Sequence, residues 1–248
     1  MKETRIIMGM PVTVEIVDPG ASRAHFESIF DYFTYIDEKF STYKDTSEIS
    51  SINRHEIALE EASDDMQTVF ALSEEIRLET KGYFDIWHAG KYDPSGLVKG
   101  WAISNAARMV SEMGYRNYYV EASGDFQASG NNDAGQDWRV GIRSPYNFDE
   151  IVKVLSIKDR GVATSGTYIR GQHIYNPRNK NKPADEILSL TVIGLDIFEA
   201  DCYATAGFAM GFAGIEYIED LKGYEGYMID HNHKATFTSG FTRYICHD

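Results

Sequence analysis

The chain has 248 residues, of which 43% are hydrophobic, and its formal net charge is -14 at pH 7. This length and hydrophobic fraction are sufficient for a sizeable core, and we expect one domain over residues 1–248. Nucleic-acid-binding proteins carry basic patches that displace counterions from phosphates, so the acidic balance and the lack of any Lys/Arg run argue against such a partner.

The chain begins with a strand and a helix. The segment RIIMGMPVTVEIV is rich in β-branched residues in alternation, which predicts a strand interrupted near Gly9 and Pro11. Apolar residues then recur at helical spacing between positions 26 and 36, and Ser22 before them can cap the helix. The next segment, FSTYKDTSEISSIN, is polar and is typical of turns.

Two further helices are predicted before the central strands. One begins after Ser63, with Asp64 and Asp65 in its first turn, and ends at Gly82. The other begins near Lys99 and ends at residue 114. The runs NYYVEAS, DFQAS and WRVGIR follow as strands separated by Gly and Asn turns.

The last third of the chain is predicted to contain a strand at LSLTVIG, helices through FEADCYATAGFAMGF and GIEYIEDL, and a closing hairpin. Between them lies GVATSGTYIRGQHIYNPRNKNKP, where small residues precede an alternation of polar and aromatic ones. A plain hairpin accounts for such a stretch, although His173 within it could also carry a proton near neutral pH. Without a regular βαβ repeat, the pattern predicts an α+β fold.

Two turn-like segments carry charged residues that could bind an anionic ligand. In YDPSGLVKGWA, Asp93 and Lys99 lie in a predicted loop that leads into a helix, and backbone N–H groups at the helix start could face an anion. An ordinary helix entry with an exposed Lys is the alternative. In EASGDFQASG, Asp125 taken alone is better interpreted as a β-turn carboxylate. Neither segment has the glycine pattern of a Rossmann or P-loop site.

The segment EADCYATAGFAMG predicts a metal site. Asp201 and Thr205 are four residues apart, so on a helix they project from one face. Both offer the hard oxygen atoms that Mg²⁺ prefers, with phosphate oxygens and water completing its shell. A solvated helix face is the alternative, but the neighbouring apolar residues disfavour it. His231 and His233 lie in the closing hairpin and are interpreted as an exposed turn.

These segments together resemble the ApbE family of FAD:protein FMN transferases. The matching pieces, in chain order, are MGMPV, FSTYKDTSEISSIN, GYFD, DPSGLVKGWA, ASGD, VATSGTYIRGQHIYNPRNKNKP and EADCYATAGFAMG. They span nearly the whole chain, and their joint order is far more specific than any one of them. The resemblance implies the family's α+β architecture, a single domain with a T-fold-like core.

The resemblance also implies an activity. Family members bind FAD and Mg²⁺, transfer the FMN moiety to a Thr hydroxyl of an acceptor flavoprotein, and release AMP. The metal would be held by Asp201, the Thr205 hydroxyl and the carbonyl of Gly96. His173 would stand beside the reacting groups as a base, and with Asp201 it forms the expected catalytic pair.

The remaining site residues implied by the resemblance contact the flavin nucleotide. They are Met8, Tyr43, Asp93, Lys99, Asp125, Thr164 and His173. Met8 and Tyr43 would lie against the flavin, Tyr43 by stacking its ring.

The chain departs from the family pattern at three points. The segment IWHAGKY is shorter than the family's usual one, Val98 replaces the usual Ala before the lysine, and Ser123 replaces the first Gly of the GGD element. None of these changes removes a ligand side chain. Two alternative functions stay open, an FAD pyrophosphatase that yields FMN and AMP, and a catalytically silent FAD-binding module.

The cysteine content and the absence of long apolar segments predict a location. Two cysteines, Cys202 and Cys246, cannot form a disulfide framework and suit a reducing compartment. The sequence contains no signal-peptide pattern at its start and no apolar segment of membrane-spanning length. We therefore expect a cytoplasmic protein with no membrane span.

Overall fold

The computed structural model describes residues 1–147, 149–166, 175–179 and 184–246. The first strand of the sequence prediction is a hairpin of two strands, β1 (Lys2–Ile7) and β2 (Met10–Ile16), with Ile7 opposite Met10. The chain reverses at Met8 and Gly9, whose φ angles are 57° and 70°. Glycine adopts such positive φ angles without steric cost, which explains the predicted interruption at this point.

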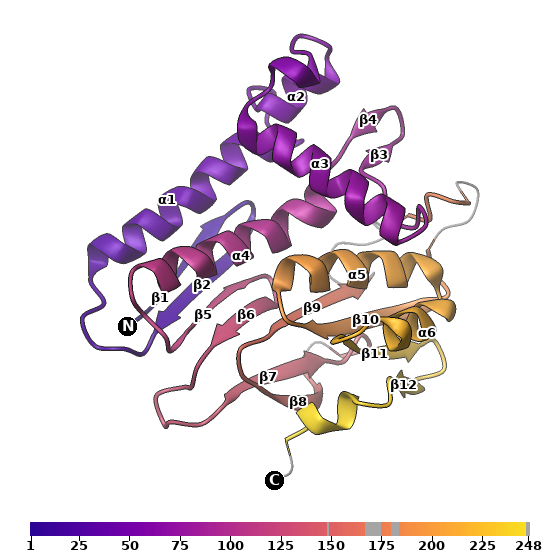
Figure 1. The fold of residues 1–248 in the computed structure, drawn as a ribbon. Helices are drawn as coiled ribbons and strands as arrows, with labels where there is room; N and C mark the ends of the chain where they lie inside the picture. Colours follow the sequence, from indigo (N-terminus) through magenta and orange to yellow (C-terminus); the bar gives the residue numbers. More distant parts are fainter. Residues whose placement is uncertain (148, 167–174, 180–183, 247–248) are drawn as a thin grey trace.

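Eight strands form one antiparallel sheet in the order β1-β2-β5-β6-β9-β10-β11-β12 (Figure 1). After the first hairpin its strands are β5 (Tyr118–Ala122), β6 (Asp125–Ser129), β9 (Gly161–Gly166), β10 (Ile187–Gly194), β11 (Glu225–Asp230) and β12 (Ala235–Phe237). The strands predicted at NYYVEAS, DFQAS and LSLTVIG and the closing hairpin are confirmed.

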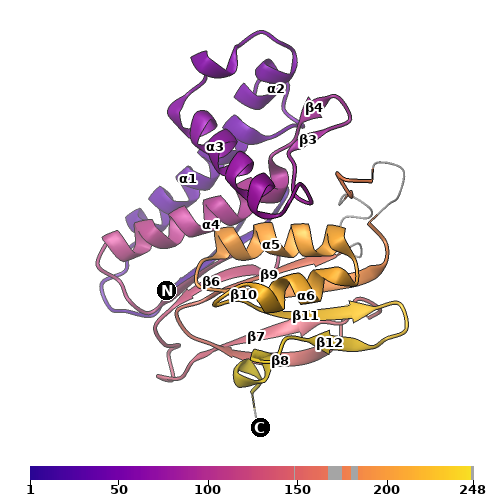
Figure 2. The ribbon, with the colours of Figure 1, turned by 45° about the vertical axis from the view of Figure 1, so that its right-hand side comes forward.

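Helices cover one face of this sheet (Figures 1 and 2). They are α1 (Arg23–Phe40), α4 (Ser95–Glu112), α5 (Ile197–Met210) and α6 (Ala213–Asp220). The apolar stripe of α1 is buried as its spacing predicted, and its members are Phe26, Ile29, Phe30, Phe33 and Ile36. The larger hydrophobic core lies between these helices and the sheet.

The opposite face of the sheet is covered by β7 (Trp138–Arg143) and β8 (Ile151–Ile157), which pair with each other. A second, smaller core fills this layer and includes Phe126, Trp138 and Phe241, the last from the short helix η2 (Phe241–Tyr244). Strand β8 was not predicted from the sequence. Its first residues are exposed or half-buried, so its sequence shows little of the alternation that marks a strand.

A third group of elements extends beyond the helical layer (Figures 1 and 2). It comprises α2 (Glu48–Asn53), η1 (Leu59–Glu61), α3 (Asp64–Glu79) and the hairpin of β3 (Trp87–His88) and β4 (Lys91–Tyr92). Helix α3 begins after Ser63, as predicted, and the Ser63 side chain caps it by accepting a hydrogen bond from the Met66 N–H at 3.4 Å. The segment predicted as turns contains α2, which Ser47 caps in the same way.

Helix α4 begins at Ser95, about one turn earlier than predicted. Asp93 precedes the helix and accepts a hydrogen bond from the Ser95 N–H at 3.1 Å. Lys99 therefore lies inside the helix, and the expected helix-entry loop around it is wrong. The error arose because Gly96 and Gly100 lower the apparent helix propensity of a segment that is helical through its packing.

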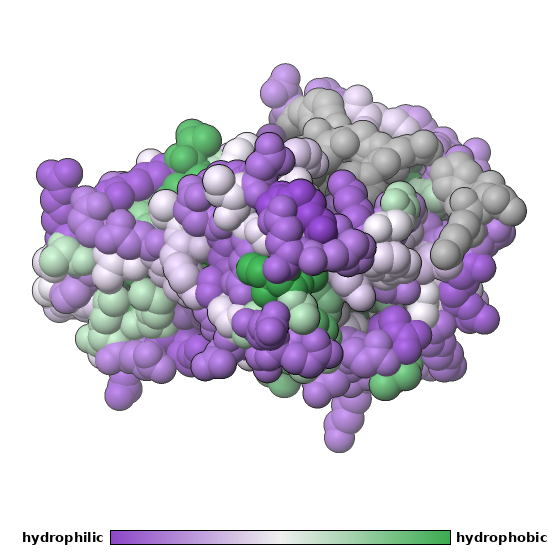
Figure 3. Space-filling model, turned by 90° about the horizontal axis from the view of Figure 1, so that it is seen from above, coloured by the Kyte–Doolittle hydropathy of each residue, from purple (hydrophilic) through white to green (hydrophobic). Residues whose placement is uncertain are grey.

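The face seen in Figure 3 is mostly hydrophilic, and hydrophobic residues form small separate patches on it. The chain as a whole has a formal net charge of -14, which disfavours association with other acidic surfaces. Among the described residues, no helix combines the length and the apolarity that a bilayer crossing requires.

Candidate functional site

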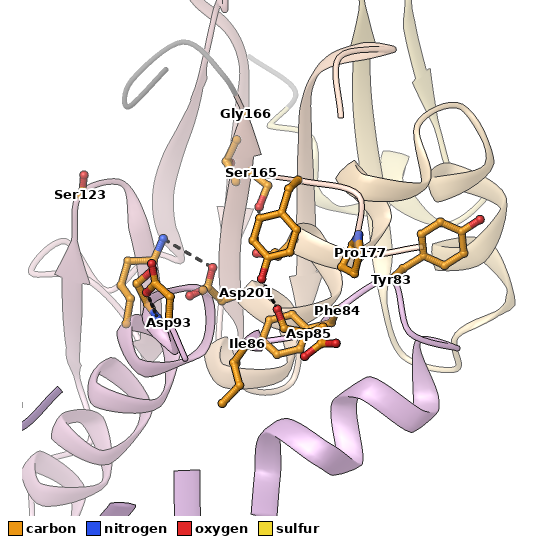
Figure 4. Close-up of a pocket in the computed structure, with 16 residues that line it drawn as sticks. Tyr83, Phe84, Asp85, Ile86, Asp93, Ser123, Ser165, Gly166, Pro177 and Asp201 are labelled. Carbon is orange, nitrogen blue, oxygen red and sulfur yellow. Dashed lines mark hydrogen bonds and ion pairs between the residues drawn. The ribbon is translucent and has the colours of Figure 1, made fainter. Parts of the chain in front are cut away.

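A pocket opens between the helical layer, the end of β9 and the segment that follows α3 (Figure 4). The empty space between its lining residues is about 940 Å³, and this figure includes a part that is open to solvent. Six of the residues expected at the site line it, namely Asp93, Gly96, Lys99, Thr164, Asp201 and Thr205. The structure therefore brings together residues that are up to 112 positions apart in the sequence (205 minus 93).

Helix α5 supplies the acidic centre of the pocket. Asp201 and Thr205 lie one turn apart and both line it, as their spacing predicted. Asp201 is only 2% exposed. Its Oδ2 accepts a hydrogen bond from the Gly100 N–H at 3.0 Å, and the Lys99 Nζ lies 3.5 Å from its Oδ1.

The close approach of α4 and α5 depends on Gly100. A Cβ atom at this position would lie 2.8 Å from the Asp201 Cβ and 3.0 Å from the Ile197 carbonyl oxygen. Both distances are shorter than ordinary van der Waals contact. The glycine therefore allows the backbone of α4 to hydrogen-bond the Asp201 carboxylate directly.

The pKa of the Asp201 carboxyl is raised. Burial is the largest cause, because a buried charge loses its hydration, and the negative charge of Asp125 adds to it. The Lys99 ammonium and the Gly100 N–H act in the opposite direction. A further positive charge beside Asp201 would thus stabilise its ionised form.

Asp125 is the first residue of β6 and is 1% exposed. Its Oδ1 accepts a hydrogen bond from the Thr164 N–H at 3.0 Å, and its Oδ2 forms an ion pair with the Lys99 ammonium. Asp125 directly follows the turn at Ser123 and Gly124, as its interpretation as a β-turn carboxylate expected, but its carboxylate is buried and bonded to other elements. Asp125 is not among the described residues that line the pocket. Instead, it connects β6 to β9 and α4.

The donor groups near Asp201 fit a hard divalent cation. The Thr205 hydroxyl oxygen lies 3.3 Å from that of Ser165, and Gly96 is adjacent, since a Cβ there would lie 3.7 Å from the Thr205 methyl group. In the described part of the chain, no three His, Cys, Asp or Glu side chains cluster as a metal site. One buried carboxylate and two neighbouring hydroxyls are hard oxygen donors of the kind that Mg²⁺ prefers, and Mg²⁺ commonly retains waters and substrate phosphates as its other ligands.

The other wall of the pocket is aromatic and apolar (Figure 4). It includes Tyr83, Phe84, Ile86, Tyr175 and Pro177. The Tyr175 hydroxyl donates a hydrogen bond to the Asp85 carbonyl oxygen, and its ring stacks on His88 with a centroid distance of 3.6 Å. No role was predicted for this wall from the sequence, although GYFD and HIYNP belong to the pieces that resemble the family.

Besides Asp125, two of the expected site residues in the described part of the chain do not line the pocket. Met8 is half-buried in the β1–β2 turn, and Tyr43, in the loop after α1, is 95% exposed. Neither is among the residues that line the pocket. His173 lies outside the described residues. The functional roles of all three stay predictions.

Comparisons with known proteins agree with the fold and the motifs. A family model described as the ApbE family matches residues 8–90 and 88–228. The FAD:protein FMN transferase of Salmonella typhimurium is 28% identical over 146 residues, which are 55% of this chain and 42% of that protein. The protein of the same name from Vibrio cholerae is 25% identical over 236 residues, covering 71% of this chain and 70% of that protein. The chain thus matches less than half of the length of the Salmonella relative.

Two solved structures share the fold over nearly the whole chain. The flavin transferase ApbE from Vibrio cholerae has a TM-score of 0.85 at 22% identity and covers 98% of each chain. The ApbE protein of Thermotoga maritima has a TM-score of 0.86 at 21% identity and covers 100% of this chain and 99% of its own. The predicted α+β fold is therefore confirmed.

Proposed function

Because the chain belongs to the ApbE family, we propose that it is an FAD:protein FMN transferase. It would transfer the FMN moiety of FAD to a Thr hydroxyl of an acceptor flavoprotein and release AMP, with Mg²⁺ bound at the pocket. The observation that carries this proposal is the convergence of Asp201, Thr205, Gly96 and Lys99 from two helices on one pocket. Two relatives that are named FAD:protein FMN transferase are 28% and 25% identical to the chain over their aligned residues.

The residues of the pocket suit phosphoryl transfer, which depends on positioning and charge neutralisation. Asp201, Thr205 and the Gly96 carbonyl would hold Mg²⁺, which supplies Lewis-acid stabilisation of negative charge on phosphate oxygens when bound. The Lys99 side chain is 17% exposed, and its ammonium lies beside Asp201. The ammonium would bind the pyrophosphate. Burial excludes bulk water from these groups and so strengthens their electrostatic interactions.

The remaining roles follow the family resemblance. We propose that Asp93 and Thr164, which line the pocket, contact the nucleotide, and that Met8 and Tyr43 contact the flavin at the periphery. His173 would accept the proton of the incoming Thr hydroxyl. We also propose a cytoplasmic location, because Cys202 and Cys246 are both free thiols, which suit a reducing compartment.

The decisive experiment is incubation with FAD and Mg²⁺, with and without an acceptor peptide of the form Asp-x-x-(Ser/Thr)-x-Thr, followed by mass spectrometry. A peptide that gains the mass of the FMN moiety, with AMP released in equal amount, supports the transferase. Equal AMP release without any peptide would identify an FAD pyrophosphatase instead. FAD that is bound and never cleaved would identify a binding module.

A further inference from the structure

The Lys99 ammonium lies between two buried carboxylates. It forms an ion pair with the Asp125 Oδ2, and it lies 3.5 Å from the Asp201 Oδ1. The side chains of Asp125 and Asp201 are 2% and 3% exposed, whereas the side chain of Lys99 is 17% exposed. Of the two carboxylates only Asp201 lines the pocket.

A lysine beside a metal-binding carboxylate presents an electrostatic conflict. Lys99 neutralises part of the Asp201 charge, so it competes with any cation that approaches this carboxylate. A divalent cation bound there would in turn repel the ammonium, and both effects are strong where water is scarce. A second anion beside Lys99 would offset this repulsion and help the ammonium to keep its position next to a metal.

We propose that Asp125 is this second anion, a positioning residue that holds Lys99 in the pocket wall and leaves the Asp201 carboxylate available to a divalent cation. This inference rests on the proposed function only for the presence of the metal. It differs from the family resemblance, which assigns Asp125 to cofactor binding. In this structure Asp125 is 1% exposed, and its two oxygens are used by the Thr164 N–H and by Lys99.

The charge of Asp125 can be removed while its shape is retained. In Asp125→Asn the amide oxygen can still accept the hydrogen bond from the Thr164 N–H, but the ion pair with Lys99 is lost. Of the two ion pairs that Lys99 forms with Asp125 and Asp201, the one with Asp201 at 3.5 Å then remains. The ammonium should move toward Asp201 and weaken its binding of a cation.

The test measures cation binding to the protein without FAD, by titration with Mn²⁺ as a hard divalent probe and electron paramagnetic resonance of the free ion. Asp125→Asn should weaken Mn²⁺ binding about tenfold or more, the effect of losing one close charge interaction. Glu121→Gln is the matched control. It makes the same chemical change on the same β5–β6 hairpin, where Glu121 accepts a hydrogen bond from the Gly124 N–H, and it should leave Mn²⁺ affinity unchanged.

A second variant separates positioning from direct ligation. If Asp125 acts by restraining Lys99, then the double variant Asp125→Asn, Lys99→Met should bind Mn²⁺ more tightly than Asp125→Asn alone. Lys99→Met by itself should bind Mn²⁺ at least as tightly as the native chain. If the double variant is as weak as Asp125→Asn, Asp125 is itself a ligand and the inference is wrong.

The remaining outcomes are also decisive. Unchanged Mn²⁺ binding by folded Asp125→Asn overturns the inference while leaving the proposed function intact. If Asp125→Asn does not fold, Lys99→Met still decides, because weaker Mn²⁺ binding by that variant contradicts a competing ammonium. A native chain that binds no Mn²⁺ and cleaves FAD in excess EDTA refutes the metal-dependent function itself.

Discussion

The two parts of the proposed site are built in different ways. Around Asp201, groups from α4, α5, β6 and β9 are buried and bonded to one another, as the contacts of Gly100, Asp125 and Thr164 show. At the other part, the loop after α1 presents Tyr43 with 95% of its surface exposed. The first part is fixed before any ligand binds, whereas the second can reach a ligand only at the surface.

This difference predicts a division of work. Preorganised, desolvated groups stabilise charge that develops during a reaction, because they need no rearrangement when the charge appears. An exposed ring offers a stacking surface that contributes to binding and little to the chemical step. Substitutions in the first part should therefore reduce turnover, and those in the second should reduce flavin affinity.

The largest effect is expected from Asp201→Ala. It removes the charged ligand of the proposed Mg²⁺ site, so AMP release from FAD should fall by more than about 100-fold. Turnover by the native chain in EDTA should fall by a similar factor. The protein should remain folded, because burial already disfavours the charge of this carboxylate, as its raised pKa indicates. AMP release is measured by chromatography and folding by a circular-dichroism melt, with exposed Asp220→Ala as the control. Near-native turnover by Asp201→Ala would contradict the metal-assisted mechanism even though the fold is established.

Tyr43→Ala tests the exposed part of the site. We expect FAD affinity to fall by about 1–3 kcal/mol through lost stacking, with a smaller change in turnover at saturating FAD. Fluorescence quenching gives the dissociation constant. Tyr35→Ala, a change at a ring of α1 that is 43% exposed, is the matched control. An unchanged FAD affinity in folded Tyr43→Ala would show that this ring does not contribute to flavin binding.

Gly100→Ala tests the contact of α4 with α5. The added methyl group would lie 2.8 Å from the Asp201 Cβ, so the helices must separate, at a cost of about 1–2 kcal/mol in the free energy of unfolding. Gly96→Ala in the same helix is the control, since its methyl group would meet Phe84 at an ordinary 3.6 Å. Urea denaturation measures both. Equal stability of the two variants would show that the helices adjust without strain.

The sequence predicted best what depends on local spacing. Asp201 and Thr205 share one helix, so their common face followed from helical periodicity, and the stripe of α1 followed in the same way. The contact of Lys99 with Asp125 could not be predicted from spacing, because it joins α4 to β6 through the packing of the sheet. The start of α4 was missed for the related reason that tertiary contacts overrode local propensity.

The aromatic wall shows the same limit. Tyr175 meets His88 and Asp85 only because the β3–β4 hairpin and the segment 175–179 lie side by side. No periodicity in either segment indicates this contact. The resemblance to a family supplied a role for many residues, but the partner of each polar group became visible only in the fold.

The smallest effect is expected from Thr205→Val, which sharpens the comparison within the buried part of the site. Thr205 lies one turn from Asp201 and, like it, lines the pocket, but its hydroxyl is neutral and only 3.3 Å from that of Ser165. Valine keeps the shape and removes one oxygen, whose place at a metal a water molecule can take. AMP release should therefore fall about tenfold or less, far less than in Asp201→Ala, and a higher Mg²⁺ concentration should restore part of it. Thr205→Ser, which retains the hydroxyl, is the control and should remain near native. If Thr205→Val were as inactive as Asp201→Ala, the Thr205 hydroxyl would have to do more than bind the metal. The expectation that loss of a charged ligand reduces activity more than loss of a neutral one would then be wrong for this site.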